Sequence, residues 1–322
     1  MIKIRKHFGI NKKTGKLKKG FKYSGKKLKS GIPQIIKTQK YKQKTGGKYI
    51  SRGTYGCAVT PAYQCPELNV KNLDKKISKL SPVNFEQVPK IFAKLYKIDP
   101  NNKYFIYPTD FCNIPRNIID KKDLQLCTKD KDGIDLSHHK VFNSIMKKGK
   151  NNLDKYRSTK LKINKATFFL KTILDAIQIL TNNNIIHLDI KSGNILELNG
   201  KIFIIDFDDY FNPTDINGFK NFLDLDYQTY VWPPEVYMQL DEAPRISNEI
   251  KQYIKQTLNK RNYKKFIQKI MIYSTGLMFK EFLLSGKKET ITEFKELIET
   301  FLNDNPQKRP TIKQALKQLQ SI

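Results

Sequence analysis

The sequence predicts an α+β protein made of two lobes, the first small and rich in strands, the second larger and helical. Residues 48–81 have the pattern of short strands, and from about residue 232 the pattern is helical to the last residue. Strands that come first and helices that come later favour this segregated class. We expect the lobes at about 48–128 and about 134–322, with a linker in the charged segment 120–160.

Two helices are predicted from apolar residues that recur at helical spacing, one over residues 84–98 and one from Asn164 to Asn182. Pro89 interrupts the first pattern close to its beginning. The second is the longer and more regular of the two. It directly precedes the part of the sequence that carries the chemistry discussed below.

Strands are expected on both sides of the second helix. Residues 104–108, which are aromatic and aliphatic up to a proline, are predicted as a strand. Two further strands at 195–196 and 202–205 flank Asn199-Gly200, a dipeptide typical of two-residue hairpin turns. The apolar strand at 202–205 would deliver the acidic residue that follows it to one end of this hairpin.

The composition is that of a folded protein, since 39% of the 322 residues are hydrophobic and 11% are aromatic. No apolar stretch reaches the about 18 residues of a membrane span, and the lysine-rich N-terminus has no apolar h-region, so we expect neither a span nor secretion. The cysteines show no metal-ligand spacing, and we expect reduced thiols in a cytosolic-type protein. They are Cys57, Cys65, Cys112 and Cys127.

Positive charge gathers at the beginning of the chain. The formal net charge is +30, and residues 1–50 contain 17 Lys or Arg and no Asp or Glu. Residues 1–47 lack helical periodicity and are predicted as a flexible basic arm. The arm could contact nucleic acid weakly and nonspecifically, an anionic surface or an acidic partner, or aid solubility, and these alternatives stay open. Richness in Lys, Asn and Ile also indicates an AT-rich genome, which we weigh above a nucleic-acid function.

One short segment places several chemically useful side chains together. It runs from His187 through Asp189, Lys191 and Asn194, and Asp206-Phe207 follows twelve residues after Asn194. A carboxylate base, a lysine and two oxygen ligands for a metal are what phosphoryl transfer from ATP requires. Asp, Asn and Gly are also common turn residues, but agreement in order, spacing and structural context favours the chemical interpretation.

The pattern H-x-D-x-K-x-x-N followed by D-F resembles the catalytic and metal-binding loops of eukaryotic-type protein kinases. The resemblance implies a kinase-like two-lobed fold, with ATP and Mg²⁺ as cofactors and a protein hydroxyl as substrate. It assigns Asp189 as the base and Lys191 as the group that neutralises the transferring phosphate. It assigns Asn194 and Asp206 as metal ligands.

The resemblance extends upstream to a glycine-rich loop and a strand lysine. The loop would be Ser51-x-Gly53-x-x-Gly56-x-Ala58, with Ser51 in place of the first glycine. Lys79 is the candidate for the lysine on the α- and β-phosphates. The nucleotide-binding residues implied are Ser51, Gly53, Gly56, Cys57, Ala58, Val59 and Lys79. The helix glutamate that should pair with Lys79 is irregular, because Ile91 occupies its expected position and Glu86 lies five residues earlier.

Downstream, Trp232-Pro233-Pro234-Glu235 resembles the A-P-E end of the activation segment, and Arg309 lies in a segment that resembles its arginine partner. A Glu235–Arg309 bridge would distinguish a protein kinase from a small-molecule kinase of the aminoglycoside-phosphotransferase type. Met271 stands where the family has an aspartate. The resemblance covers roughly residues 48–320, and composition and insertions are similar to those of kinases of large nucleocytoplasmic DNA viruses.

Two departures from the family pattern keep alternatives open. Leu188 replaces the arginine of H-R-D, so we expect no activation through phosphorylation of Thr214 or Thr229, and Asp208 replaces the glycine of D-F-G. Despite these departures, the sequence favours an active Ser/Thr-type kinase over a pseudokinase scaffold or a small-molecule kinase. The expected location is cytoplasmic, in the host cytoplasm or the virion if the protein is viral.

Overall fold

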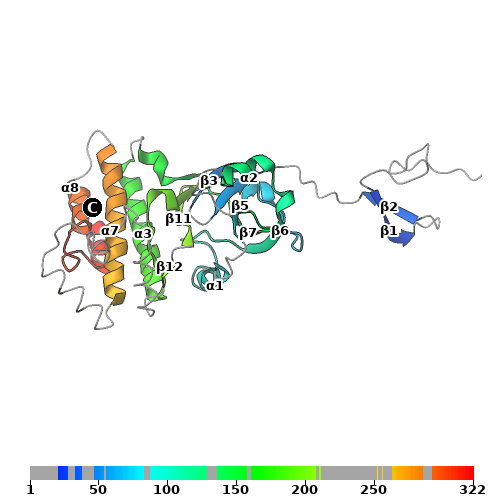
Figure 1. Ribbon diagram of the computed structural model, residues 1–322. Coiled ribbons are helices and arrows are strands. Elements are labelled where there is room, and N and C mark those ends of the chain that lie inside the picture. Colours follow the sequence, from blue (N-terminus) through cyan, green and yellow to red (C-terminus); the bar gives the residue numbers. More distant parts are fainter. Residues whose placement is uncertain are drawn as a thin grey trace, which may run out of the picture. The chain divides into compact units, whose positions relative to one another are not determined.

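The chain divides into two compact units, each described here by itself (Figure 1). Unit 1 consists of Met1–Pro82 and Asn113–Asn143, and unit 2 consists of Val83–Cys112 and Ser144–Ile322. The protein is mixed α and β, with small, mainly antiparallel sheets, which agrees with the predicted α+β class. The computed structural model describes residues 21–27, 33–37, 47–53, 56–82, 88–128, 136–157, 161–207, 210–211, 252, 256, 263–285 and 292–322.

A five-stranded sheet has the strand order β3-β4-β5-β7-β6, and each of these strands lies wholly or partly in unit 1. Strands β3, β4 and β5 pair antiparallel, with Ala58 opposite Lys79. Short 3-10 turns, η1 (Leu73–Lys75) and η2 (Arg116–Ile118), lie in the connections. The strands are β3 (Lys48–Arg52), β4 (Cys57–Thr60), β5 (Lys76–Ser81), β6 (Asp110–Pro115) and β7 (Lys140–Lys147).

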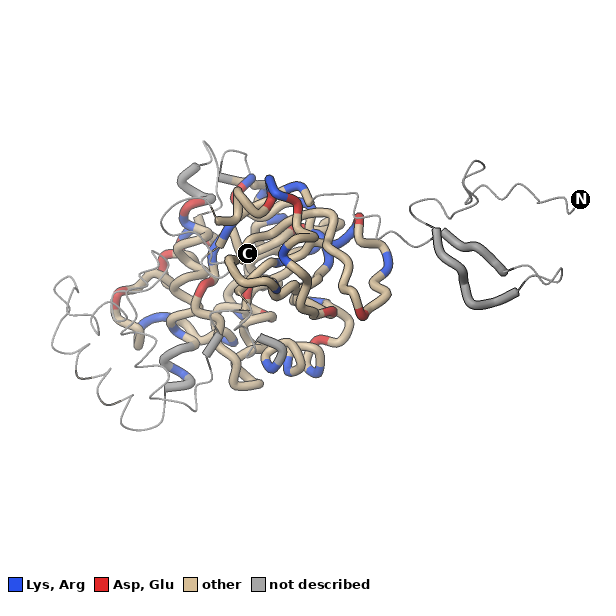
Figure 2. Tube along the Cα trace, turned by 45° about the vertical axis from the view of Figure 1, so that its right-hand side comes forward, with Lys and Arg blue, Asp and Glu red and all other residues tan. Residues whose placement is uncertain are grey.

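The segment predicted as an irregular basic arm contains regular structure. Strands β1 (Phe21–Lys27) and β2 (Pro33–Lys37) form a two-stranded antiparallel sheet, with Tyr23 opposite Ile35. Aromatic residues in β1 and β-branched residues in β2 favour extended backbone. In the view of Figure 2, Lys and Arg are spread along the coloured part of the chain.

The segment 120–160 is not the loop that its charge predicted. It contains helix α2 (Lys121–Thr128), strand β7, the short strand β8 (Asn151–Asn152) and the 3-10 turn η3 (Leu153–Arg157). Helix α2 has only two turns, too few for helical periodicity to be recognised. Strand β7 buries Val141 and Ile145 among polar residues, and pairing in the middle of the sheet fixes a segment whose own pattern is weak.

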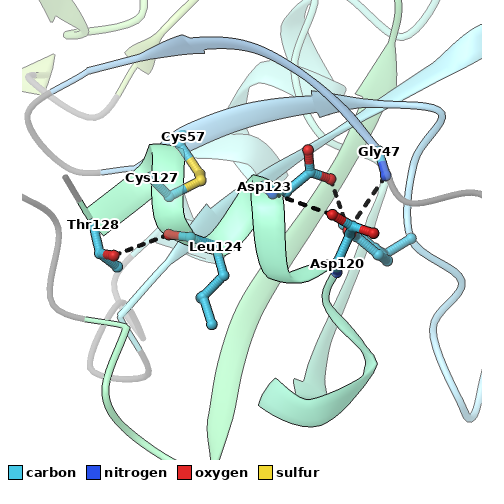
Figure 3. Close-up of a disulfide and its surroundings, with 8 residues drawn as sticks. Gly47, Cys57, Asp120, Asp123, Leu124, Cys127 and Thr128 are labelled. Atoms are coloured by element: carbon cyan, nitrogen blue, oxygen red, sulfur yellow. Dashed lines mark hydrogen bonds between the residues drawn. A yellow bond between two sulfur atoms is a disulfide. The ribbon is translucent and has the colours of Figure 1, made fainter.

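The expectation of reduced cysteines was wrong. Cys57 of β4 and Cys127 of α2 form a disulfide across 70 residues of sequence, and no free cysteine occurs among the four (Figure 3). Both Cys57 and Cys127 are fully buried. Sequence spacing could not show this bond, because cysteines so far apart are brought together only by the packing of α2 on the sheet.

The hydroxyl of Tyr63 ties helix α2 to the beginning of β3. It donates to Asp123 Oδ2 at 2.9 Å and accepts from the backbone N–H groups of Asp120 at 2.9 Å and Gly47 at 3.3 Å. Burial raises the pKa values of both Tyr63 and Asp123. The disulfide and this cluster together brace the β3–β4 hairpin (Figure 3).

Unit 2 is built on helix α3 (Ile163–Asn182), which confirms the long helix predicted from Asn164 to Asn182. Its buried side, including Phe169, Ile173 and Ile177, belongs to one large apolar core. Four other helices contribute side chains to the same core: α1 (Val88–Ile98), α7 (Tyr263–Ser285), α8 (Thr292–Phe301) and α9 (Ile312–Leu319). Pro89 is tolerated because it falls in the first turn of α1.

The predicted hairpin is confirmed. Strands β10 (Ile195–Leu198) and β11 (Lys201–Ile204) pair antiparallel, and β8 joins β10 on its other side. The turn residues Asn199 and Gly200 both have positive φ, +53° and +75°. A two-residue turn of this kind requires such backbone at both positions, which Asn and Gly adopt readily.

The strand predicted at 104–108 is reduced to one isolated parallel bridge, between Phe105 and Ile204. The buried carboxylate of Asp99 explains the difference, since it accepts the backbone N–H groups of Lys103, Tyr104 and Phe105 at 2.7–2.9 Å. These donors are therefore not available for a strand ladder. In the described part of the chain, no helix has the length and apolar character needed to cross a membrane.

Candidate active site

The predicted catalytic loop connects β9 (Ile186–His187) to β10 in unit 2, and the 3-10 turn η4 (Ser192–Asn194) ends it. Strand β9 pairs with β12 (Tyr210–Phe211). Asp189 and Asn194 are buried, with 6% and 7% of their surfaces exposed. The loop is anchored because Ile190 is fully buried in the apolar core of the unit.

Asn194 and Lys191 hold one oxygen of the Asp189 carboxylate. The Asn194 Nδ2 donates to Asp189 Oδ2 at 2.7 Å and to the Asp189 carbonyl oxygen at 2.9 Å. The ammonium of Lys191 lies 2.7 Å from the same Oδ2. Three of the four loop residues singled out from the sequence are thus brought into direct contact.

The other oxygen of Asp189 has no partner. Oδ1 is buried and accepts no hydrogen bond, although a buried acceptor of this kind normally has one. A carboxylate whose Oδ2 is fixed by two donors and whose Oδ1 has no partner keeps Oδ1 for a hydroxyl that donates a hydrogen bond or a proton. This is the geometry that a general base needs.

His187 supports the loop as a neutral residue. Its Nε2 lies 2.9 Å from the carbonyl oxygen of Ile205, and its Nδ1 accepts the backbone N–H of Asp189 at 3.2 Å. The carbonyl can only accept, so Nε2 carries the proton and Nδ1 does not. Burial lowers the pKa of His187, which keeps this tautomer uncharged. Its role is to hold Asp189.

Asp206 follows β11 by two residues and lies close along the backbone to Asn194. The N–H of Ile205 donates to the carbonyl oxygen of Asn194 at 3.0 Å. Asp206 has a φ of +64°, a left-handed conformation that Asp tolerates better than most residues. Phe207 then packs edge-on against His187, with ring centroids 4.9 Å apart. Asp208, the departure noted in the sequence, lies outside the described residues.

Asn194 and Asp206 fit a hard divalent cation by their chemistry. Because Asn194 Nδ2 faces Asp189, its carbonyl Oδ1 is the amide atom left for a cation. A carboxylate and an amide oxygen are ligands that Mg²⁺ accepts, with substrate phosphates and water completing its shell. Among the described residues, no group of three or more His, Cys, Asp or Glu is placed to hold a metal ion.

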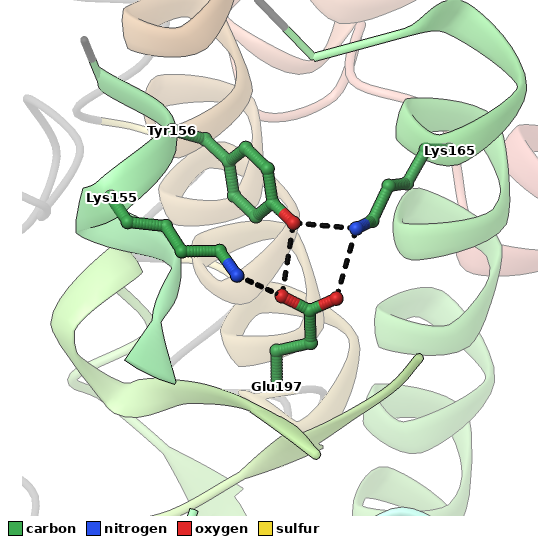
Figure 4. A network of polar contacts seen from close by, with 4 residues as sticks. All are labelled: Lys155, Tyr156, Lys165 and Glu197. Atoms are coloured by element: carbon green, nitrogen blue, oxygen red, sulfur yellow. Dashed lines mark hydrogen bonds and ion pairs between the residues drawn. The ribbon is translucent and has the colours of Figure 1, made fainter. Parts of the chain in front are cut away.

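A polar network that the sequence did not reveal lies beside this loop (Figure 4). Glu197 of β10 accepts from the hydroxyl of Tyr156 and the ammonium of Lys165, both at 2.9 Å, and from Lys155. Burial alone would raise the pKa of Glu197, but these donors outweigh it and lower the pKa to about 2. Its members come from η3, α3 and β10, and nothing in their spacing distinguishes them from other charged residues.

The glycine-rich segment forms the β3–β4 hairpin of unit 1. The N–H of Gly53 donates to the carbonyl of Gly56 at 2.9 Å. A Cβ on Gly56 would lie 2.8 Å from the Leu80 carbonyl and 2.6 Å from Ser81 Oγ, so only glycine fits. Lys79 is half-buried on β5. Ser51 and Gly53 are exposed, Ala58 is half-buried, and Cys57 and Val59 are fully buried.

The structure also shows where Ile91 of α1 and Arg309 lie. Ile91 is 1% exposed in the core of unit 2, so an apolar contact replaces the expected carboxylate on that helix, and Glu86 lies outside the described residues. Arg309 is 1% exposed, donates to the carbonyl oxygen of Asn303 at 2.7 Å and stacks over Tyr273. Glu235, its predicted partner, also lies outside the described residues.

The hairpin residues and Lys79 belong to unit 1, and the loop residues 187–206 belong to unit 2. Strand pairing orders the first group, and side-chain contacts order the second. Compared with known proteins, the chain matches no protein-family model and no curated sequence.

Proposed function

We propose that this protein is a divergent Ser/Thr-type protein kinase that transfers the γ-phosphate of Mg-ATP to protein hydroxyls. The observation that carries the proposal is the Asp189 carboxylate, with Oδ2 held by Asn194 and Lys191 and Oδ1 without a partner. A substrate hydroxyl could donate to Oδ1 and lose its proton to it as the hydroxyl oxygen bonds to the γ-phosphorus, while the bond from that phosphorus to the bridging oxygen breaks and ADP leaves.

Lys191 has a second role in this proposal. Its side chain is 28% exposed, whereas that of Asp189 is 8% exposed, so the ammonium lies at the open side of the pair. From there it can reach the transferring phosphate and reduce the charge that accumulates on its oxygens.

Mg²⁺ and ATP are the proposed cofactors. Asn194 and Asp206 are the residues that would hold Mg²⁺, which would supply positive charge to neutralise the phosphates. Asn194 connects the metal site to the base Asp189. Its Nδ2 donates to Asp189, and its Oδ1 is left for the cation. We propose that the Gly53–Gly56 hairpin and Lys79 bind the phosphates of ATP. Lys79 lies on β5, the third strand in the order of its sheet. In protein kinases the phosphate-binding lysine also lies on the third strand.

The protein substrate is proposed over a small molecule because of Arg309. The guanidinium is buried, held by backbone carbonyls and the Tyr273 ring, and therefore serves structure and not chemistry. Lys269 is buried beside it, and burial followed by the charge of Arg309 lowers the pKa of Lys269. A carboxylate nearby would stabilise two positive charges that are buried together. We propose that Glu235 supplies this carboxylate.

The test is transfer of labelled phosphate from Mg-ATP to the protein itself and to a basic and an acidic test protein. Wild type is compared with Asp189→Asn, which keeps the shape and removes the base, and with Asp175→Asn, a matched change at the Lys171–Asp175 surface pair. We expect transfer by wild type and Asp175→Asn only. Absence of transfer by wild type, with Mg-ATP still raising its melting temperature, would contradict the proposal and favour a scaffold or a small-molecule kinase.

A further inference from the structure

We propose that Asp154 is a positioning residue that fixes the η4 turn and thereby the metal-binding amide of Asn194. The inference rests on the proposed function for its chemical meaning, but its structural part can be measured without phosphate transfer. Asp154 lies on η3, about forty residues before the loop, and belongs to no motif in the sequence.

The carboxylate of Asp154 is used on both oxygens. Oδ1 accepts a short hydrogen bond from the Ser192 hydroxyl, and Oδ2 accepts from Asn152 Nδ2 at 2.8 Å. Ser192 is 1% exposed, so its hydroxyl would lose a buried partner if Asp154 were removed. Asp154 Oδ2 also faces Gly193, where an added Cβ would lie 3.5 Å away, in ordinary contact.

The η4 turn transmits this contact to Asn194. Ser192, Gly193 and Asn194 form a single 3-10 turn, closed by the N–H of Asn194 on the carbonyl oxygen of Lys191 at 2.9 Å. A side chain that fixes the first residue of so short a turn also fixes the third. Asn194 in turn positions Asp189 through two hydrogen bonds, so displacement of the turn would disturb both the metal ligand and the base.

The same η3 segment holds the chain again just after the loop. Lys155 and Tyr156, the two residues after Asp154, bond to Glu197, three residues beyond Asn194 (Figure 4). Asn194 is therefore flanked by two attachments to one short segment, Ser192 on one side and Glu197 on the other. This arrangement favours a positioning role for η3, because one contact would suffice for simple packing.

The experiment compares Asp154→Ala, Ser192→Ala and Asp154→Asn with wild type, and uses Asp175→Ala as a matched surface control. Asp154→Asn keeps an acceptor for Ser192, and the Asn152 amide can turn to match it, so it should restore wild-type behaviour. Three quantities are measured: hydrogen exchange at the backbone amides of Asn194 and Ile205, calorimetric binding of Mn²⁺ in the presence of ADP, and the Mg²⁺ concentration for half-maximal phosphate transfer.

Loss of a charge-assisted bond to a buried hydroxyl should change each quantity by about tenfold in Asp154→Ala. Ser192→Ala should give a similar change, and the double variant should add little to either. A merely structural role would lower the melting temperature and the amount of active protein, but would leave the Mg²⁺ midpoint and the Mn²⁺ affinity unchanged. That result in folded Asp154→Ala and Ser192→Ala would overturn the inference.

The outcomes separate this inference from the kinase proposal. If wild type transfers phosphate and neither Asp154→Ala nor Ser192→Ala alters exchange or metal binding, Asp154 is not a positioning residue and the kinase proposal stands. If wild type transfers no phosphate but Mn²⁺–ADP binding weakens in both variants, the positioning role stands and the kinase proposal fails. Failure of wild type to bind Mn²⁺ with ADP would overturn both.

Discussion

Asn194 binds Asp189 twice through one amide nitrogen, at 2.9 Å to its carbonyl oxygen and at 2.7 Å to its carboxylate Oδ2. This relationship determines which atoms remain for chemistry. Asp189 Oδ1 is left without a partner, and the Oδ1 of Asn194 is turned away from the carboxylate. The base and a metal ligand are thus oriented by the same pair of hydrogen bonds.

Replacing Asn194 by alanine should cost both stability and activity. The Asp189 carboxylate would keep Lys191 but lose a buried donor, a loss worth about 1–3 kcal/mol in unfolding free energy. Phosphate transfer should fall by at least about a hundredfold, since the metal ligand is lost as well. Urea unfolding and transfer rates measure the two effects. Wild-type stability in this variant would show that the paired hydrogen bonds do not hold Asp189.

The Cys57–Cys127 disulfide should stabilise unit 1. It closes a loop of 70 residues, for which chain entropy predicts about 4 kcal/mol. A Cys57→Ser, Cys127→Ser double variant should therefore unfold at lower denaturant than wild type, and wild type with reductant should approach the variant. The independent check is thiol labelling of denatured, unreduced protein, where we expect no reaction. Four labelled cysteines per chain would contradict the bond.

Glu197 should make the protein sensitive to acid. Its pKa is lowered from 4.5 to about 2 in the folded state, so its ion pairs contribute stability above the unfolded pKa, and that contribution is lost as pH falls through the folded pKa. Glu197→Gln should therefore be less stable than wild type near neutral pH, with the difference shrinking between pH 4.5 and about 2. Denaturant unfolding over this range measures it. A difference that is constant with pH would contradict the network.

Gly56 and Gly53 should respond differently to alanine. At Gly56 the new Cβ would meet the Leu80 carbonyl at 2.8 Å, which would displace β5 and Lys79 with it, whereas at Gly53 the nearest atom is 3.8 Å away. We expect Gly56→Ala to lower stability by about 1–3 kcal/mol and to weaken ATP binding. Gly53→Ala should keep wild-type stability. Equal melting temperatures for the two variants would show that the hairpin does not pack as described.

Much of this arrangement was predictable where the signal is local. Helix α3 followed from its apolar spacing, and the β10–β11 hairpin followed from Asn199-Gly200. These features depend on residues near in sequence, whose types restrict the backbone strongly.

The missed features depend on tertiary packing. The disulfide joins cysteines 70 residues apart, and Asp154 reaches Ser192 across 38 residues, so neither leaves a pattern in the sequence. The strand expected at 104–108 failed because a single carboxylate, Asp99, takes its backbone donors. Asp154 and Asp99 are ordinary acidic residues in the sequence. Only the fold shows which N–H groups or hydroxyl donate hydrogen bonds to their carboxylates.

The most direct test of the account is the single-turnover rate of phosphate transfer from labelled Mg-ATP to protein hydroxyls, with wild type and Asp189→Asn measured side by side. The account predicts phosphoserine or phosphothreonine with wild type, and a loss of at least about a thousandfold in the variant, because its base is gone while its shape remains. Equal rates in the two proteins would contradict Asp189 as the base. No phosphoprotein with wild type would contradict the kinase itself.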